Sequence, residues 1–103
     1  MPIFSLLIAG EPVIAVAASD YPRALGFAAD PFIRSELTDL THPDGRPLLE
    51  NGTDITVRHA FPKEQAIWET DVQKGIRDGD IDCRADAYDD LWFTFLIPYE
   101  DPL

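Results

Sequence analysis

The sequence predicts an α+β fold: a small mixed or antiparallel sheet with helices packed on one face. Two observations carry this prediction. Short apolar runs bounded by turn residues alternate with helical stripes, in the order β-β-α-α-β-α-β. The chain has 103 residues, 46% of them hydrophobic, which fits one globular domain over residues 1–103.

The first two expected strands form a hairpin. Residues 3–9 and 12–17 are apolar, and the pair Gly10-Glu11 between them is typical of a type II′ turn. Pro12 fits this arrangement because it is the first residue of the second strand, where a missing N–H is tolerated.

Residues 21–40 are expected to form two short helices, or one helix broken at Pro31. Ser19 or Asp20 is the expected cap of the first helix, with Pro22 in its first turn, and Asp30 directly precedes Pro31. A polar cap followed by a first-turn proline is typical of a helix start. Two turns follow, His-Pro-Asp-Gly at residues 42–45 and Asn-Gly at residues 51–52.

The second half of the chain is expected to hold a strand, a long helix and a final strand. Residues 55–60 alternate apolar and polar side chains, as in a half-buried strand. Residues 62–77 carry one apolar stripe, and Gly79 is a C-terminal cap. Residues 91–97 are apolar on both faces, which fits a central strand or an edge strand that pairs with a second copy in a homodimer.

The charge of the chain limits its partners. Nineteen acidic residues stand against eight basic ones, which gives a net charge of −11 at pH 7. Binding to nucleic acid or to an anionic membrane needs Lys and Arg, so neither is expected. The acidity favours a basic protein surface or a metal ion as partner, or serves only to solvate the surface.

Aspartates concentrate between residues 78 and 90, and this segment is the leading candidate site. Tyr88 and Ile67, together with Trp92, are predicted to be apolar anchors beside it. We therefore predict a non-enzymatic module that engages a basic protein partner, as an inhibitor or regulator of the nucleic-acid-mimic, anti-CRISPR, immunity or antitoxin type. The acidic contact residues are Asp78, Asp80, Asp82, Asp86, Asp89 and Asp90.

The alternative hypothesis is a calcium-binding loop in the same segment. Calcium loops of the EF-hand kind place oxygen ligands at positions 1, 3, 5, 9 and 12. Two positions depart from this pattern, because Cys83 stands where glycine is needed and Asp89 stands where a bidentate glutamate is usual. The candidate ligands at the required spacing are Asp78, Asp80, Asp82, Asp86 and Asp89.

A small enzyme is the third hypothesis. His42 lies in a turn and His59 in a strand, and neither belongs to a recognisable catalytic motif. Cys83 has no second cysteine to pair with, and the surrounding aspartates make its thiol a poor nucleophile. No cofactor motif is present, and the absence of a basic residue before Arg23 argues against a signal peptide, so we expect a cytoplasmic location.

Overall fold

A computed structural model describes residues 2–50, 52–89 and 91–101 of the chain. The α+β class and the predicted order of elements are confirmed, with one additional short helix before the last strand. The elements are β1 (Ile3–Ile8), β2 (Glu11–Ala17), α1 (Tyr21–Ala29), α2 (Pro31–Asp39), β3 (Ile55–His59), α3 (Pro62–Arg77), α4 (Arg84–Asp89) and β4 (Phe93–Phe95).

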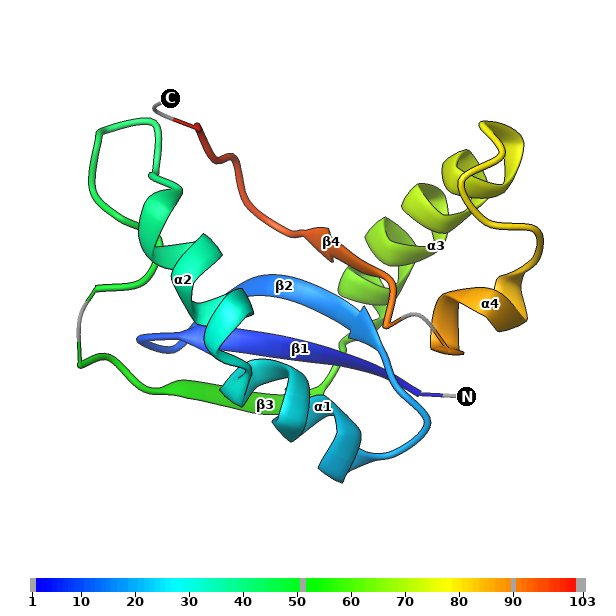
Figure 1. Ribbon diagram of the computed structural model, residues 1–103, viewed down its shortest axis with the longest axis horizontal. Helices are drawn as coiled ribbons and strands as arrows, with labels where there is room; N and C mark the ends of the chain where they lie inside the picture. Colours follow the sequence, from blue (N-terminus) through cyan, green and yellow to red (C-terminus); the bar gives the residue numbers. More distant parts are fainter. Residues whose placement is uncertain (1, 51, 90, 102–103) are drawn as a thin grey trace.

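The strands form one antiparallel sheet in the order β3-β1-β2-β4 (Figure 1). The turn between β1 and β2 lies at Ala9 and Gly10, one residue earlier than predicted. Both residues have positive φ, 52° and 82°, which is the conformation of a type I′ rather than a type II′ turn. The two central strands are therefore β1 and β2, and the edges are β3 and β4.

Helices cover both faces of the sheet, which differs from the prediction of helices on one face. On one face, Phe4, Leu6 and alternate residues of β2 share a core with α1 and α2. On the other face, Ile3 and the small residues Ala15 and Ala17 pack with α3 and α4 (Figure 1). The reason is that β1 and β2 are apolar on both faces, as strands covered on both sides usually are.

The helices α1 and α2 are separate, and each begins at an aspartate. The Asp20 carboxylate accepts from the Arg23 N–H at 2.9 Å, and the Asp30 carboxylate accepts from the Phe32 N–H at 2.8 Å. The first helix ends before Asp30 because Pro31 has no N–H with which to continue the helical hydrogen bonds.

The second core joins α3 and α4 to the C-terminal segment. Trp68 is fully buried, and its indole N–H donates to the Trp92 carbonyl at 3.0 Å. The Trp92 ring in turn lies against Gly75, where a Cβ atom would come within 2.8 Å of the ring. The glycine in the last turn of α3 is therefore explained by the close approach of an aromatic ring.

The last strand is shorter than predicted and lies at an edge. β4 spans Phe93–Phe95, whereas residues 91–97 were expected to be extended. Leu91 has a positive φ of 53°, which ends the turn after α4 and delays the start of strand pairing. Of the two alternatives for this strand, the edge position is the one observed.

Two further findings concern regions singled out in the sequence. The predicted turn at residues 51–52 is described only at Gly52, which has a positive φ of 86°, and residue 51 lies outside the described residues. Within the described ranges, no helix combines the length and apolar character that a membrane span needs.

Candidate functional site

The predicted acidic site lies at the C-terminal end of α3, in the turn after it and in α4. We call residues 78–89 the acidic segment. All its aspartates are exposed except Asp86, which is half-buried, and Asp90 lies outside the described residues. The five aspartates described are Asp78, which ends α3, Asp80, Asp82, Asp86 and Asp89. The segment is a solvated acidic surface built partly on a helix that the sequence did not reveal.

Of the three predicted apolar anchors, only Ile67 is exposed. Tyr88 is 3% exposed, its ring centroid lies 5.7 Å from that of Trp68, and burial raises the pKa of its hydroxyl. Tyr88 is therefore a core residue, which corrects its predicted place on a contact surface. Ile67 is 37% exposed on α3. Trp92, the third expected anchor, is half-buried, and its indole N–H donates to Asp71 at 2.9 Å.

The geometry of the acidic segment does not resemble a calcium loop. Within the described residues, no group of three or more acidic, histidine or cysteine side chains is arranged to hold a metal ion. Asp86 and Asp89 belong to the helix α4 rather than to a loop that folds back around a cation. The spacing of aspartates along the sequence is therefore not matched by convergence in space.

A groove of about 490 Å³ lies between α2 and β4. Buried Ile14 and Leu37 line it from the core. We call it the aromatic groove, because it is also lined by four aromatic side chains from α2, β4 and the C-terminal segment: Phe32, Phe93, Phe95 and Tyr99. It joins segments that lie far apart in the sequence.

The aromatic groove is an exposed apolar patch. Phe32 is 69% exposed, Tyr99 46% and Phe93 39%, so three of the seven exposed large apolar residues described in the chain gather here. The rings also touch one another: the centroids of Phe95 and Tyr99 are 4.1 Å apart, and those of Phe93 and Phe95 are 6.1 Å apart. A contiguous apolar patch of this kind usually marks a contact site.

The charged residues around β4 are acidic. Glu36 and Asp101 line the aromatic groove, and its described lining residues include no Lys, Arg or His. A second hollow along β4 is lined by Asp71, Thr94 and three of the groove aromatics, Phe93, Phe95 and Tyr99, and Asp71 is its charged member. An apolar surface framed in this way is complementary to an apolar segment that carries positive charge.

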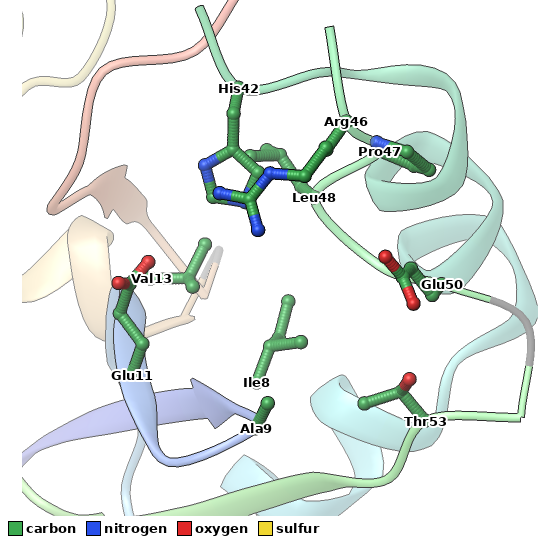
Figure 2. Close-up of a pocket in the computed structure, with 10 residues that line it drawn as sticks. All are labelled: Ile8, Ala9, Glu11, Val13, His42, Arg46, Pro47, Leu48, Glu50 and Thr53. Atoms are coloured by element: carbon green, nitrogen blue, oxygen red, sulfur yellow. The ribbon is translucent and has the colours of Figure 1, made fainter. Parts of the chain in front are cut away.

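A smaller cavity of about 230 Å³ lies at the turn end of the β1–β2 hairpin. His42, Arg46 and Glu50 extend into it from the loop after α2, with Glu11 on the hairpin side (Figure 2). Arg46 pairs instead with Asp44, at 2.8 Å, and this hydrogen-bonded pairing lowers the pKa of the Asp44 carboxyl. No side-chain hydrogen bond orients the His42 ring among the residues described.

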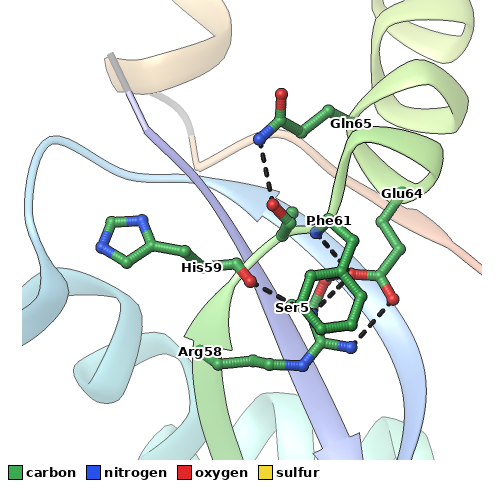
Figure 3. Close-up of polar contacts among 7 residues, drawn as sticks. Ser5, Arg58, His59, Phe61, Glu64 and Gln65 are labelled. Atoms are coloured by element: carbon green, nitrogen blue, oxygen red, sulfur yellow. Dashed lines mark hydrogen bonds and ion pairs between the residues drawn. The ribbon is translucent and has the colours of Figure 1, made fainter.

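A polar cluster of Ser5, Arg58 and Glu64 is also structural (Figure 3). The Glu64 carboxylate accepts from the Ser5 hydroxyl at 2.7 Å, from two Arg58 nitrogens at 2.7 and 2.9 Å, and from the Phe61 N–H at 2.9 Å. These bonds, with Arg58 the largest contributor, lower the pKa of Glu64 to about 2. A carboxylate held ionised and saturated with donors is a poor base for activating Ser5.

The second histidine joins this cluster only through its backbone, because the His59 carbonyl accepts from Arg58 at 3.0 Å (Figure 3). His59 is exposed on β3, and its ring lies 4.7 Å from the ring of Phe4. This contact is apolar stacking at the end of the sheet. Neither histidine therefore has the surroundings of a catalytic base within the described part of the chain.

The aromatic groove was not expected from the sequence. Residues 21–40 were expected to form helices and residues 91–97 a strand, and no contact between the two segments was predicted. One signal was available in the sequence. Phe32 and Glu36 are four residues apart and so lie on the same face of a helix, and a charged glutamate is not expected on a buried face. The convergence with Tyr99 depends on tertiary structure.

Comparisons with protein-family models, with curated proteins and with solved structures find no match to this chain. Its function is therefore inferred from geometry and charge.

Proposed function

We propose that this protein is a non-enzymatic binding module that engages a basic protein partner, and that the partner binds in the aromatic groove. The observation that supports this proposal most strongly is the groove itself: exposed aromatic side chains framed by Glu36, Asp71 and Asp101. Acting by occupying a surface of the partner, such a module serves as an inhibitor or a regulator.

The aromatic side chains supply the affinity. Phe32, Phe93 and Tyr99 expose large rings that lose water when a partner covers them, and aromatic residues dominate the energetics of protein interfaces. Phe93 packs against the rings of Phe27 and Phe95, and Tyr99 packs against Phe95, so these two side chains lose little conformational freedom on binding.

The carboxylates supply selectivity and speed of association. The net charge of −11 attracts a cationic partner over a distance of about 10 Å at moderate salt, and it repels acidic proteins. In this proposal the acidic segment, residues 78–89, steers the partner toward the molecule, whereas direct contact occurs at the groove.

Selection from a phage-displayed library of random peptides tests this proposal. Peptides that bind the protein are expected to be rich in Lys or Arg and in apolar residues, and to bind more weakly as salt is raised. A selection with no enrichment, or one that yields peptides without excess basic residues, contradicts the proposal.

Two matched variants locate the contact. Phe32→Ser and Ile67→Ser each remove one exposed apolar side chain, from α2 and from α3 respectively, and neither is expected to disturb folding. Binding of a selected peptide is expected to fall about tenfold or more in Phe32→Ser and to change less than about twofold in Ile67→Ser. The reverse pattern would move the contact from the groove to α3.

A further inference from the structure

We infer that the aromatic groove binds an extended peptide segment of alternating basic and apolar residues, which pairs with the open edge of β4 as an additional strand. This inference rests on the proposed function and specifies its partner. Strand addition to a sheet edge is a common way to bind peptides, because backbone hydrogen bonds give affinity and alternate side chains give specificity.

The outer side of β4 is available for pairing. The Leu96 N–H donates to the Val13 carbonyl at 2.7 Å, and the Trp92 carbonyl accepts from β2 at 3.1 Å. Successive residues direct their backbone groups to opposite sides of a strand, so Phe93 and Phe95 present theirs away from β2. Among the strands that the structure describes, none pairs with this side of β4.

The opposite edge of the sheet is protected. The Ala60 N–H donates to the Ile3 carbonyl at 2.9 Å, which by the same alternation turns the backbone groups of Val57 outward. The Tyr21 hydroxyl donates to this Val57 carbonyl at 3.3 Å, and Arg58 adds a charge beside it. A side chain that caps the edge and a charge within the strand are ways in which proteins block unwanted pairing.

β4 carries no comparable protection within its own sequence. Residues 93–97 read Phe-Thr-Phe-Leu-Ile, without a charge or a proline. The acidic residues that frame this segment, such as Asp71 and Glu36, come from neighbouring helices instead. An edge left open between acidic neighbours admits a basic strand and repels an acidic one.

The two faces beside β4 require different side chains from the added strand. Phe93 and Phe95 line the aromatic groove on the α2 side. Asp71, on the α3 side, lines the second hollow together with Thr94, whereas Phe93, Phe95 and Tyr99 border both hollows. Because side chains alternate along a strand, apolar residues of the peptide meet the groove while intervening Lys or Arg residues meet Asp71.

A second copy of this chain is a poorer occupant of the same edge. Each copy carries a net charge of −11, and pairing two β4 edges would bring both sets of framing carboxylates together. Like charges placed together at an interface oppose association. Charge complementarity therefore favours a basic segment over the homodimer through residues 91–97 that the sequence also allowed.

A synthetic peptide of about ten residues that alternates Lys and Val tests the inference directly, since its length matches a typical strand. Two further versions carry N-methyl groups on alternate backbone nitrogens, one on the Lys residues and one on the Val residues. Each version keeps every side chain and every charge, but loses the N–H donors along one edge. Affinities are measured by fluorescence anisotropy, and light scattering gives the mass of the protein alone.

Strand addition predicts that the unmodified peptide binds and that only one methylated version loses affinity. The loss is expected to be about tenfold or more, because several backbone hydrogen bonds disappear together, whereas the other version stays within about twofold. Equal binding by all three peptides would overturn strand addition while leaving the groove as a binding site. No binding by the unmodified peptide, or a protein dimer that excludes it, would also overturn the inference, and the library selection then decides the proposed function separately.

Discussion

Glu64 shows how a single polar residue can organise this sheet. It lies at the start of α3, 7% exposed, and bonds to Ser5 on β1 and to Arg58 on β3. The Arg58 guanidinium also stacks 3.8 Å from the centroid of the Phe61 ring. Because the buried acceptor is fully paired, this cluster ties α3 to two strands without leaving an unsatisfied group.

The pKa of Glu64 makes this contribution dependent on pH. Its folded-state value of about 2 lies below the ordinary 4.5, so the stabilisation is fully present above pH 4.5 and is lost as pH falls toward 2. This shift in the pKa of Glu64 corresponds to a contribution on the order of 3 kcal/mol to the free energy of unfolding. Glu64→Gln is expected to lower the free energy of unfolding at pH 7 by about 2–3 kcal/mol. The same substitution should also reduce the loss of stability between pH 4.5 and pH 2. Urea denaturation at each pH measures both effects.

The matched control is Glu69→Gln, which breaks an exposed pair with Arg84 at 3.1 Å. Its effect on stability is expected to stay below about 1 kcal/mol at pH 7. If Glu64→Gln and the wild type lose stability in parallel between pH 5 and pH 2, the assigned role of Glu64 is wrong.

Gly75 makes a second residue-level prediction. A methyl group at this position would meet the Trp92 ring at 2.8 Å, and the ring is held by its bond to Asp71. Gly75→Ala is therefore expected to destabilise the protein by about 1–3 kcal/mol, even though alanine favours helices. Gly26→Ala in α1 has open space around it and should stabilise by about 0.5–1 kcal/mol. Thermal unfolding that shows both variants equally stable would contradict the packing described here.

The helices and strands differ in how well they could be predicted from their own sequence. The starts of α1 and α2 were predictable because an aspartate cap and a proline act within one turn. The division of helices between two faces was not, because an apolar run such as residues 12–17 shows that both sides are covered but not by what. The helix α4 was hidden by its aspartates, which usually favour turns.

The candidate site was predictable only in its charge. Exposed aspartates in residues 78–89 follow from composition, and the structure shows them solvated. Tyr88 reads as a surface anchor in an acidic stretch, yet its place on the inner side of α4 buries it against Trp68. The aromatic groove brings residue 32 beside residues 93–99, and no local pattern encodes that proximity.

The acidic segment makes a prediction at the level of an element. Replacing Asp80, Asp82 and Asp86 together by Asn is expected to change the free energy of unfolding by less than about 0.5 kcal/mol, because these side chains are largely exposed. Association with a basic peptide selected from the library is expected to slow several-fold at low salt, while dissociation stays nearly unchanged. Stopped-flow fluorescence measures both rates.

A control with the same change in net charge separates position from total charge. Glu11, Glu50 and Asp54 are exposed acids near the hairpin end of the molecule, and their replacement by the corresponding amides removes three charges there. An equal loss of association rate in both triple variants would show that only the net charge matters. An unchanged affinity and rate in the first variant would refute a steering role for the acidic segment.

At the scale of the whole molecule, the sheet has one protected and one open edge. The two edges are β3 and β4 (Figure 1). The Tyr21 hydroxyl caps the β3 side, whereas the β4 side opens next to exposed aromatic rings. The net charge of −11 opposes association with a second acidic copy at this open edge. The open edge, the charge and the exposed apolar surface are the three features that support the proposed basic, extended partner.

The most direct test is an NMR titration of the ¹⁵N-labelled protein with the alternating Lys-Val peptide. The account predicts that amide signals of Phe93, Phe95 and the N-terminal turn of α2 shift most, because these residues line the groove and the open edge. Residues 78–89 should shift little, since they steer the peptide without holding it. Shifts confined to residues 67–89, or no shifts at a saturating peptide concentration, would contradict the account.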